Sequence, residues 1–290
     1  MTAASPTRAR RASGAQGDRL VSGLSHFVLV VWCILVIGPM LWTLLSSFKT
    51  SREIFSSPFS LPADWSFTNY VNAWVSSEIG RAFANTVVVV GVALVLVMLL
   101  GAMCAYVLGR FSFPGRRAIY YLMLAGLTFP VFLAIVPLFF VLRNLSLLGT
   151  LPGLIITYVA FALPFTVFFL YAFFRGLPDE ISEAAAIDGA GEWRTFFSVM
   201  LPMAKPGMAS VAIFNFLGLW NQFILPVALN TNESNWVLSQ RLAAFASAMT
   251  YQVDFGALFA AVVITVVPVL VVYIFFQRQL QGSVTQGTMK

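Results

Sequence analysis

Residues 86–108 read TVVVVGVALVLVMLLGAMCAYVL and contain no acidic, basic or histidine side chain. As an α-helix that rises ~1.5 Å per residue, this stretch would be about 34 Å long, enough to cross the ~30 Å hydrocarbon core of a bilayer. A helix that is apolar on every side belongs in lipid or deep inside a large protein. The stretch therefore predicts a transmembrane span.

The rest of the chain has the same character. Of its 290 residues, 59% are hydrophobic and 10% are charged, whereas soluble domains carry about 25% charged residues. Five more apolar stretches lack charge and histidine: 27–48, 118–142, 151–174, 206–229 and 257–276. The predicted fold class is an all-α integral membrane protein with six transmembrane helices within residues 26–276. A polar, disordered cytoplasmic tail (1–25) precedes this domain, and a short cytoplasmic tail (277–290) follows it.

The positions of lysine and arginine predict how the spans are oriented, because cytoplasmic loops are enriched in these residues. If both termini are cytoplasmic, twelve of the 17 lie inside: Arg8, Arg10, Arg11, Arg19, Arg110, Arg116, Arg117, Arg175, Arg194, Lys205, Arg278 and Lys290. The other five lie outside: Lys49, Arg52, Arg81, Arg143 and Arg241. The basic excess is spread over short segments and indicates topology rather than nucleic-acid binding.

Several functional features are missing from the sequence. The spans hold no acidic, basic or histidine residue of the kind found in proton relays and ion-coupled carriers. No GxxxxGK[ST] phosphate-binding loop occurs, so the chain should not hydrolyse ATP itself. Its single histidine, His26, and its separated cysteines, Cys33 and Cys104, predict no metal site, cofactor or catalytic centre. Energy for uphill transport would have to come from another polypeptide.

Polar side chains are few inside the spans and gather in the fifth, at Asn215, Trp220, Asn221 and Gln222. An amide in lipid needs a partner on another helix or in a water-lined cavity. Two interpretations remain open. The amides could hold helices together, or they could hydrogen-bond a hydroxyl-rich solute while Trp220 offers a stacking face.

Prolines lie well inside four spans, at Pro39, Pro130, Pro137, Pro164 and Pro268. Each one bends its helix and frees a carbonyl one turn back. They could act as hinges for gating, or they could reflect the higher frequency of proline in membrane helices.

The loop 175–205, between the fourth and fifth spans, reads as two short helices. Pro178, Asp179 and Glu180 are typical of a first helical turn, since the acids complement the helix dipole. Three alanines follow, and Gly189 is a natural helix stop. Alanine side chains would let this helix sit deep in a groove of another protein.

The second helix of the loop begins at Glu192 and ends at Leu201-Pro202. Its large apolar residues, Trp193, Phe196, Phe197 and Met200, fall at i, i+3, i+4 and i+7 and predict a single apolar face. That face could anchor the protrusion against the membrane helices.

This loop resembles the EAA…G…LP signature of the permease subunits of binding-protein-dependent ABC importers, through Glu183-Ala184-Ala185, Gly189 and Leu201-Pro202. The string 183–190 is similar to the form found in the carbohydrate branch. Other similar positions follow in order from Val31 to the C-terminus: 69–70, 85–86, 105–106, 110–115, 137–138, 148–150, 162–165 and 220–223. The chain most resembles the second permease subunit of maltose-type sugar importers.

The resemblance implies the type I ABC importer permease fold, in which six transmembrane helices carry a cytoplasmic two-helix coupling loop. It implies a heterodimer with a second permease subunit, two ABC ATPase subunits, and an extracytoplasmic solute-binding protein, all in the cytoplasmic (inner) membrane of a prokaryote. No cofactor or metal is implied. The implied ATPase-coupling residues are Glu183, Ala184, Ala185, Asp188, Gly189, Ala190, Leu201 and Pro202.

The function that follows from the resemblance is ATP-driven import of a sugar or oligosaccharide, with this chain forming half of the pathway. The main alternative is the permease of a non-sugar ABC importer, for amino acids or phosphate, because those branches share the EAA loop. A stand-alone carrier or channel would transport without partners. An integral-membrane enzyme would need clustered acidic, histidine or nucleophilic residues near the bilayer.

Overall fold

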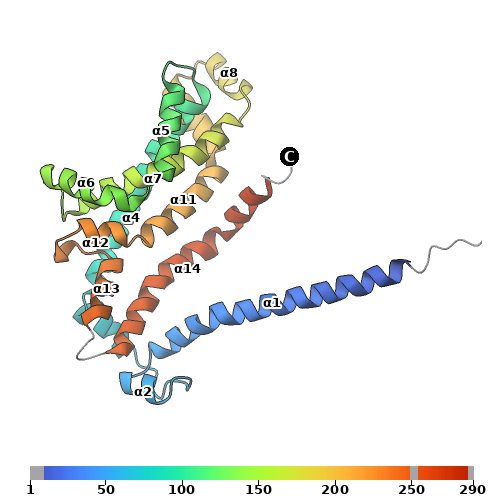
Figure 1. Cartoon of the computed structure of the whole chain (residues 1–290). Coiled ribbons are helices and arrows are strands. Elements are labelled where there is room, and N and C mark those ends of the chain that lie inside the picture. Colours follow the sequence, from blue (N-terminus) through green and yellow to red (C-terminus); the bar gives the residue numbers. More distant parts are fainter. Residues whose placement is uncertain (1–9, 249–253, 287–290) are drawn as a thin grey trace, which may run out of the picture.

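The computed structural model describes residues 10–248 and 254–286, and all regular elements in these two segments are helical (Figure 1). The longer helices are α1 (Arg10–Ser46), α4 (Ile79–Arg110), α5 (Arg116–Thr128), α6 (Val131–Asn144), α7 (Leu151–Arg175), α11 (Lys205–Trp220), α13 (Leu238–Ala248) and α14 (Phe255–Gln286). Shorter elements are α2 (Ser51–Ser56), α3 (Thr68–Val71), η1 (Asn72–Ser76), α8 (Glu180–Ile187), α9 (Glu192–Thr195), η2 (Phe196–Met200), α10 (Leu201–Met203), α12 (Ile224–Leu229) and η3 (Glu233–Asn235).

Four helices are long and apolar enough on their own to cross a membrane: Ser22–Ser46 within α1, Ile79–Arg110, Leu151–Arg175, and Phe255–Gln277 within α14. Two bent helix pairs would raise the number of spans to six if each pair crosses once. The structure therefore confirms the all-α membrane class and leaves the count between four and six.

The predicted third span, residues 118–142, is not one helix. It consists of α5 and α6, which are bent by 107° relative to each other. The break falls at Phe129 and Pro130, both with extended backbone. Proline has no N–H to continue the helix and pushes the residue before it out of the helical region. Helix α6 consequently projects sideways from the bundle (Figure 1).

The predicted fifth span, 206–229, is also interrupted. Helix α11 ends at Trp220, and the chain turns through residues 221–223 before α12 begins. At its other end, α11 makes a 77° bend with the helical segment Glu192–Met203 that leads into it. Asn221 and Gln222 therefore lie at a helix end and not inside a continuous span.

Close packing of α4 on α7 forms the centre of the bundle, with α5 and α11 against them (Figure 1). The two helices approach where Gly101 faces Thr166: a Cβ added to Gly101 would lie 2.4 Å from Thr166 Cγ2. Small residues at such crossings let membrane helices come into contact. A cluster around Tyr106, Phe174 and Met200 fills the end of the bundle that carries α8.

The opposite end is closed by polar contacts between distant segments. Asn85 Nδ2 donates to the carbonyls of Ser234 and Trp236, and Thr86 Oγ1 accepts from the backbone N–H of Leu238. Gln240 and Asn230 bond to each other through both amides and backbone. These contacts hold the segment between α12 and α13 over the end of α4.

Helix α1 stands apart from the bundle and meets it near α14, where Trp42 contacts Phe259 with 5.1 Å between ring centroids (Figure 1). The helix begins at Arg10, so it covers most of the segment 1–25 for which the sequence predicted a disordered tail; residues 1–9 lie outside the described segments. The tail can be helical because it continues an apolar helix, and extending an existing helix by one residue does not require a new helix nucleus.

Candidate coupling loop and solute cavity

The first helix of the loop is α8, and it ends as the sequence predicts. Gly189 adopts φ +75°, the left-handed conformation that suits glycine. Its N–H donates to the Ala186 carbonyl at 3.0 Å, and the N–H of Ala190 donates to Ala185 at 2.9 Å. These bonds satisfy carbonyls that the helix end would otherwise leave free. Glu180 and Glu183 lie in its first turn.

The two faces of α8 differ in a way that the sequence did not reveal. Ala185 is buried within this chain, only 7% exposed. Glu183, Ala184, Ile187 and Asp188 point outward, and the Ile187 side chain is 87% exposed. The surface that α8 offers to a partner is therefore the face of Ala184 and Ile187, whereas Ala185 packs against its own loop.

The second helix of the loop is split into α9, the π-helical η2 and α10. Its predicted single apolar face is divided as a result. Phe196 and Met200 are buried, and Phe196 packs on Tyr106 with 5.1 Å between ring centroids. Trp193 and Phe197 stack on each other and stay exposed. The π-helical turn rotates these positions out of α-helical register.

The remaining signature residues close the loop. Leu201 is half-buried and Pro202 is exposed within α10, which leads into α11 through the buried Ala204. Pro202 lies inside the continuous helical segment Glu192–Met203, where it has no N–H to donate to the preceding turn.

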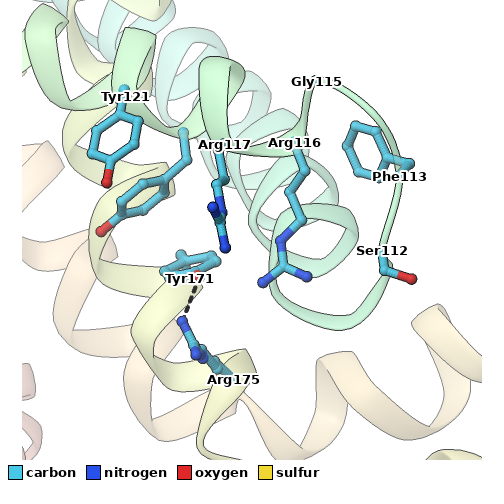
Figure 2. A pocket seen from close by; sticks show the side chains of 9 residues that line it. Ser112, Phe113, Gly115, Arg116, Arg117, Tyr121, Tyr171 and Arg175 are labelled. Atoms are coloured by element: carbon cyan, nitrogen blue, oxygen red, sulfur yellow. Dashed lines mark hydrogen bonds between the residues drawn. The ribbon is translucent and has the colours of Figure 1, made fainter.

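A hollow of about 540 Å³ lies at the same end of the bundle, between the N-terminal half of α5 and the C-terminal end of α7 (Figure 2). Its walls carry Arg116, Arg117 and Arg175 together with Tyr120, Tyr121 and Tyr171. Arg175 donates to the Tyr171 hydroxyl at 2.9 Å.

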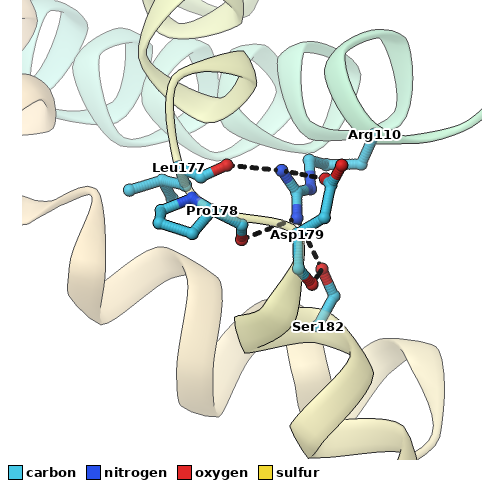
Figure 3. Close-up of polar contacts among 5 residues, drawn as sticks. All are labelled: Arg110, Leu177, Pro178, Asp179 and Ser182. Carbon is cyan, nitrogen blue, oxygen red and sulfur yellow. Dashed lines mark hydrogen bonds and ion pairs between the residues drawn. The ribbon is translucent and has the colours of Figure 1, made fainter.

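The Arg110 side chain, at the C-terminal end of α4, holds the start of the coupling loop (Figure 3). Its guanidinium donates to the carbonyls of Leu177 (2.8 Å) and Pro178 (3.1 Å) and to Ser182 Oγ (2.6 Å). It also pairs with Asp179 at 2.9 Å. The Arg110 side chain is 8% exposed, whereas the Asp179 side chain is 86% exposed, so the arginine is buried at the edge of a loop whose acceptors still meet water. One arginine thus ties α4 to the first turn of α8.

A second cavity, of about 380 Å³, opens beside the break between α5 and α6. Its walls are mostly apolar and include five aromatic residues: Phe129, Tyr158, Phe161, Phe165 and Phe214. Asn215 and Gln222 are the amides on its lining. Ligand cavities commonly have this composition, with apolar and aromatic walls and a few polar groups that orient the ligand.

The four predicted pathway residues therefore separate into two groups. Asn215 lines the cavity and also donates to Thr166 Oγ1 on α7 at 2.8 Å. Gln222 lines the cavity at the end of α11. Trp220 is buried and donates from Nε1 to the Thr265 carbonyl on α14, which is a helix–helix contact. Asn221 bonds back to the Leu217 carbonyl of its own helix.

Several residues of both regions were not predicted as site residues. Ile187 is the exposed apolar residue of α8, and a large aliphatic side chain beside Asp188 in a cytosolic loop was a usable signal. Arg110 entered the sequence analysis as a cytoplasmic charge and as part of the family-like stretch 110–115, without a role in holding the loop. The aromatic walls of the cavity carried no signal, because phenylalanine is abundant in every span. Across the described residues, no three His, Cys, Asp or Glu side chains cluster closely enough to hold a metal.

Comparison with known families decides the assignment. The family described as binding-protein-dependent transport system inner membrane component matches residues 97–286. The chain belongs to this family. It is the membrane-embedded permease subunit of an ABC importer, as the loop 183–202 indicated.

Curated relatives of the permease include several sugar transporters. It is 68% identical to the diacetylchitobiose uptake system permease protein NgcG of Streptomyces coelicolor, over 96% of this chain and 92% of the relative. It is 30% identical to the trehalose transport system permease protein SugB of Mycobacterium tuberculosis, over 89% and 97% of the two chains. It is 31% identical to the multiple sugar-binding transport system permease protein MsmG of Streptococcus mutans, over 91% and 96%.

Solved structures support the same fold. A chain of a bacterial ABC transporter involved in import of the acidic polysaccharide alginate superposes with a TM-score of 0.80 at 21% identity, over 94% of this chain and 99% of that chain. A chain of the alginate transporter in complex with a periplasmic protein bound to an alginate pentasaccharide gives 0.68 at 17% identity, over 91% and 94%.

Proposed function

We propose that the permease forms half of the translocation pathway for a short N-acetylated oligosaccharide of the diacetylchitobiose type. The observation that carries this proposal is the 68% identity to a diacetylchitobiose uptake permease over nearly the whole chain. Relatives named for trehalose and for multiple sugars, at about half that identity, support a carbohydrate more broadly.

The cavity between α5, α7 and α11 suits such a solute. Its aromatic walls offer faces for the apolar side of a sugar ring, and Asn215 and Gln222 offer amide donors and acceptors for hydroxyl and acetamido groups. The cavity carries no acidic or basic side chain, which fits an uncharged solute better than an amino acid or a phosphate.

The remaining partners are part of the same proposal. A second permease subunit would complete the pore, two ATPase subunits would supply energy, and a solute-binding protein would deliver the sugar. The absence of a phosphate-binding loop from this chain supports separate ATPases. The distribution of lysine and arginine supports a cytoplasmic-membrane location with both termini inside.

Uptake by a deletion strain tests the solute. Removal of the permease should abolish uptake of labelled diacetylchitobiose and leave uptake of a labelled amino acid unchanged, and the plasmid-borne gene should restore it. Trehalose serves as the comparison sugar. Loss of trehalose uptake with normal diacetylchitobiose uptake would mean that the permease carries trehalose and not diacetylchitobiose. Loss of amino-acid uptake alone would exclude the carbohydrate function.

We assign coupling to the ATPases to the outward face of α8 and to its glycine stop, with Glu183, Ala184, Asp188 and Gly189 from the family signature and Ile187 added. Ala185, Ala190, Leu201 and Pro202 would shape the loop. Gly189→Pro removes the N–H that bonds to Ala186 and requires a negative φ, so the end of α8 should unravel. We expect normal insertion, continued ATP hydrolysis and loss of uptake.

Alanine substitutions at Gly189 and Gly191 separate the effect of backbone strain from the effect of steric crowding. Nothing lies within 4 Å of a Cβ added to Gly189 or to Gly191, but only Gly189 has a positive φ. Gly189→Ala should therefore destabilise the loop by about 1 kcal/mol, whereas Gly191→Ala should behave like the wild type. Equal uptake and ATPase rates in both variants and in Gly189→Pro would contradict the coupling role.

A further inference from the structure

The hollow between α5 and α7 has a chemistry that solute transport and ATPase coupling do not use. Arg116 and Arg117 reach it from the first turn of α5, and Arg175 reaches it from the last turn of α7 (Figure 2). Figure 2 shows the three guanidinium groups turned toward the same space around the Tyr171 ring. Three positive charges converge in one concave site of about 540 Å³.

No negative charge in the described part of the chain balances them. The lining contains no aspartate or glutamate. The ion pairs of that part are Arg110 with Asp179 and Arg241 with Glu78, and neither involves these three arginines.

The three arginines have neutral partners or none. Arg116 donates to the Phe111 carbonyl at 3.0 Å and Arg175 to the Tyr171 hydroxyl. The Arg117 side chain is exposed and has no hydrogen-bond partner among the side chains and backbone of residues 22–248 and 254–277. Like charges held close together repel, so an anion in the hollow would stabilise the arrangement.

Topology alone does not account for this geometry. Arginines that only mark the cytoplasmic side can extend separately into water. Here they share a site with three tyrosines, and Tyr120 and Tyr171 pack with 4.5 Å between ring centroids. Arginine forks and phenolic hydroxyls together are suited to phosphate oxygens.

The residues around the hollow indicate whether the phosphate belongs to a free ion or to a lipid. At the edge of the hollow, α5 exposes two large side chains: Tyr121, which lines the hollow, is 63% exposed, and its neighbour Leu122 is 65% exposed. We expect this surface to face lipid, because α5 is half of a candidate membrane span and the two side chains are not covered by the rest of the chain. A site that is basic at one end and apolar beside it matches an amphipathic ligand better than a free ion.

We propose that this hollow binds the phosphate headgroup of an anionic membrane phospholipid, with the acyl chains lying along α5. The site belongs to neither the solute pathway nor the coupling face. The inference requires only that the chain is embedded in a bilayer. It does not depend on which solute the permease transports.

Native mass spectrometry of the assembled transporter, released from nanodiscs of equal phosphatidylglycerol and phosphatidylcholine, tests the proposal. The wild type should retain phosphatidylglycerol preferentially. Arg117→Gln should weaken retention about fivefold, and Arg117→Gln with Arg175→Gln about 25-fold. Arg117→Lys keeps the charge and should recover most of the loss. Arg143→Gln, the same change at an exposed arginine of α6, should retain the lipid as the wild type does.

Four outcomes would overturn the proposal. Retention of phosphatidylglycerol by the double variant would exclude the site. Equal loss in the Arg143→Gln control would mean a general charge effect. Thermal stabilisation of the wild type by inorganic phosphate in nanodiscs of pure phosphatidylcholine, absent from the double variant, would identify a free anion instead. Loss of the ATPase subunits from the double variant with unchanged lipid retention would identify a protein contact.

Discussion

At the scale of single residues, Arg110 links the membrane helices to the coupling loop. Its four contacts reach backbone carbonyls, a serine hydroxyl and one carboxylate within six residues of chain (Figure 3). The carbonyl bonds come from a buried charged donor, and each such bond is worth about 1.5–3 kcal/mol. The ion pair adds less, because the Asp179 side chain is 86% exposed and exposed pairs contribute about 0–1 kcal/mol.

Arg110→Gln should therefore release the loop, while Asp179→Asn should not. We expect proteolysis of the segment between α7 and α9 to become at least about tenfold faster in Arg110→Gln, with reduced uptake and unchanged membrane insertion. Asp179→Asn keeps the bonds to Leu177, Pro178 and Ser182 and is the matched control. Limited digestion of inside-out membrane vesicles with a protease that cleaves after glutamate, at Glu180 or Glu183 of this segment, measures both. Equal protection in the two variants would show that the carbonyl bonds do not hold the loop.

The buried amide Asn215 permits a test of the two interpretations that the sequence left open. Thr166→Val removes the partner hydroxyl but leaves the amide on the cavity wall, whereas Asn215→Leu removes the amide itself. If Asn215 contacts the solute, Asn215→Leu should lower uptake at least about tenfold, and Thr166→Val should have little effect. If the amide only joins helices, both variants should lose similar stability, about 0.6 kcal/mol for such bonds, and their uptake should fall alike.

At the scale of elements, the contact between α4 and α7 depends on a glycine that has room for no side chain. A Cβ at Gly101 would overlap Thr166, whereas nothing lies within 4 Å of one at Gly91, ten residues earlier on the same helix. Both glycines are helical, so an alanine changes helix propensity equally at each site. Comparing alanine variants at the two positions therefore isolates the free-energy cost of the clash with Thr166.

Gly101→Ala should destabilise the bundle by about 1–3 kcal/mol, and Gly91→Ala should leave it unchanged or slightly more stable. Thermal unfolding of the purified protein in one detergent measures the difference as a lower Tm for Gly101→Ala alone. A lower Tm of the same size in Gly91→Ala would mean that the loss does not come from the helix crossing.

The sequence predicted these elements well where composition decides them. Long apolar runs require helices in lipid, and Gly189 marked the end of α8 because few other residues favour a positive φ. The break at Pro130 was not predictable, since Pro39, Pro137, Pro164 and Pro268 lie inside continuous helices. The direction in which Ala185 faces and the π-helical turn at Phe196–Met200 depend on tertiary packing, which periodicity does not contain.

At the scale of the whole molecule, the distribution of charge predicts the orientation in the membrane. Excess lysine and arginine marks the side that carries α8 and the basic hollow, so this side should face the cytoplasm. The aromatic cavity lies between the two ends of the bundle. This arrangement puts the proposed coupling loop and the proposed solute cavity at different depths of the same subunit.

Cysteine labelling in intact cells should show this orientation. After Cys33 and Cys104 are replaced by alanine, a cysteine at the exposed Ser198, in the coupling loop, should react with an impermeant maleimide only after the cells are opened. A cysteine at the exposed Ser56, in α2, should react in intact cells. The reverse pattern would mean that the subunit is inverted, and labelling of both in intact cells would exclude a single orientation.

Helix α1 has a consequence for how the protein is made. The span Ser22–Ser46 buries none of its most apolar window against the rest of the chain, so it needs no later segment to become a stable membrane helix. It also leaves the ribosome before the other spans. The contact of Gly101 with Thr166, in contrast, cannot form until α7 has been synthesised. Anchoring in the bilayer and assembly of the bundle are therefore separate stages of biogenesis, in that order.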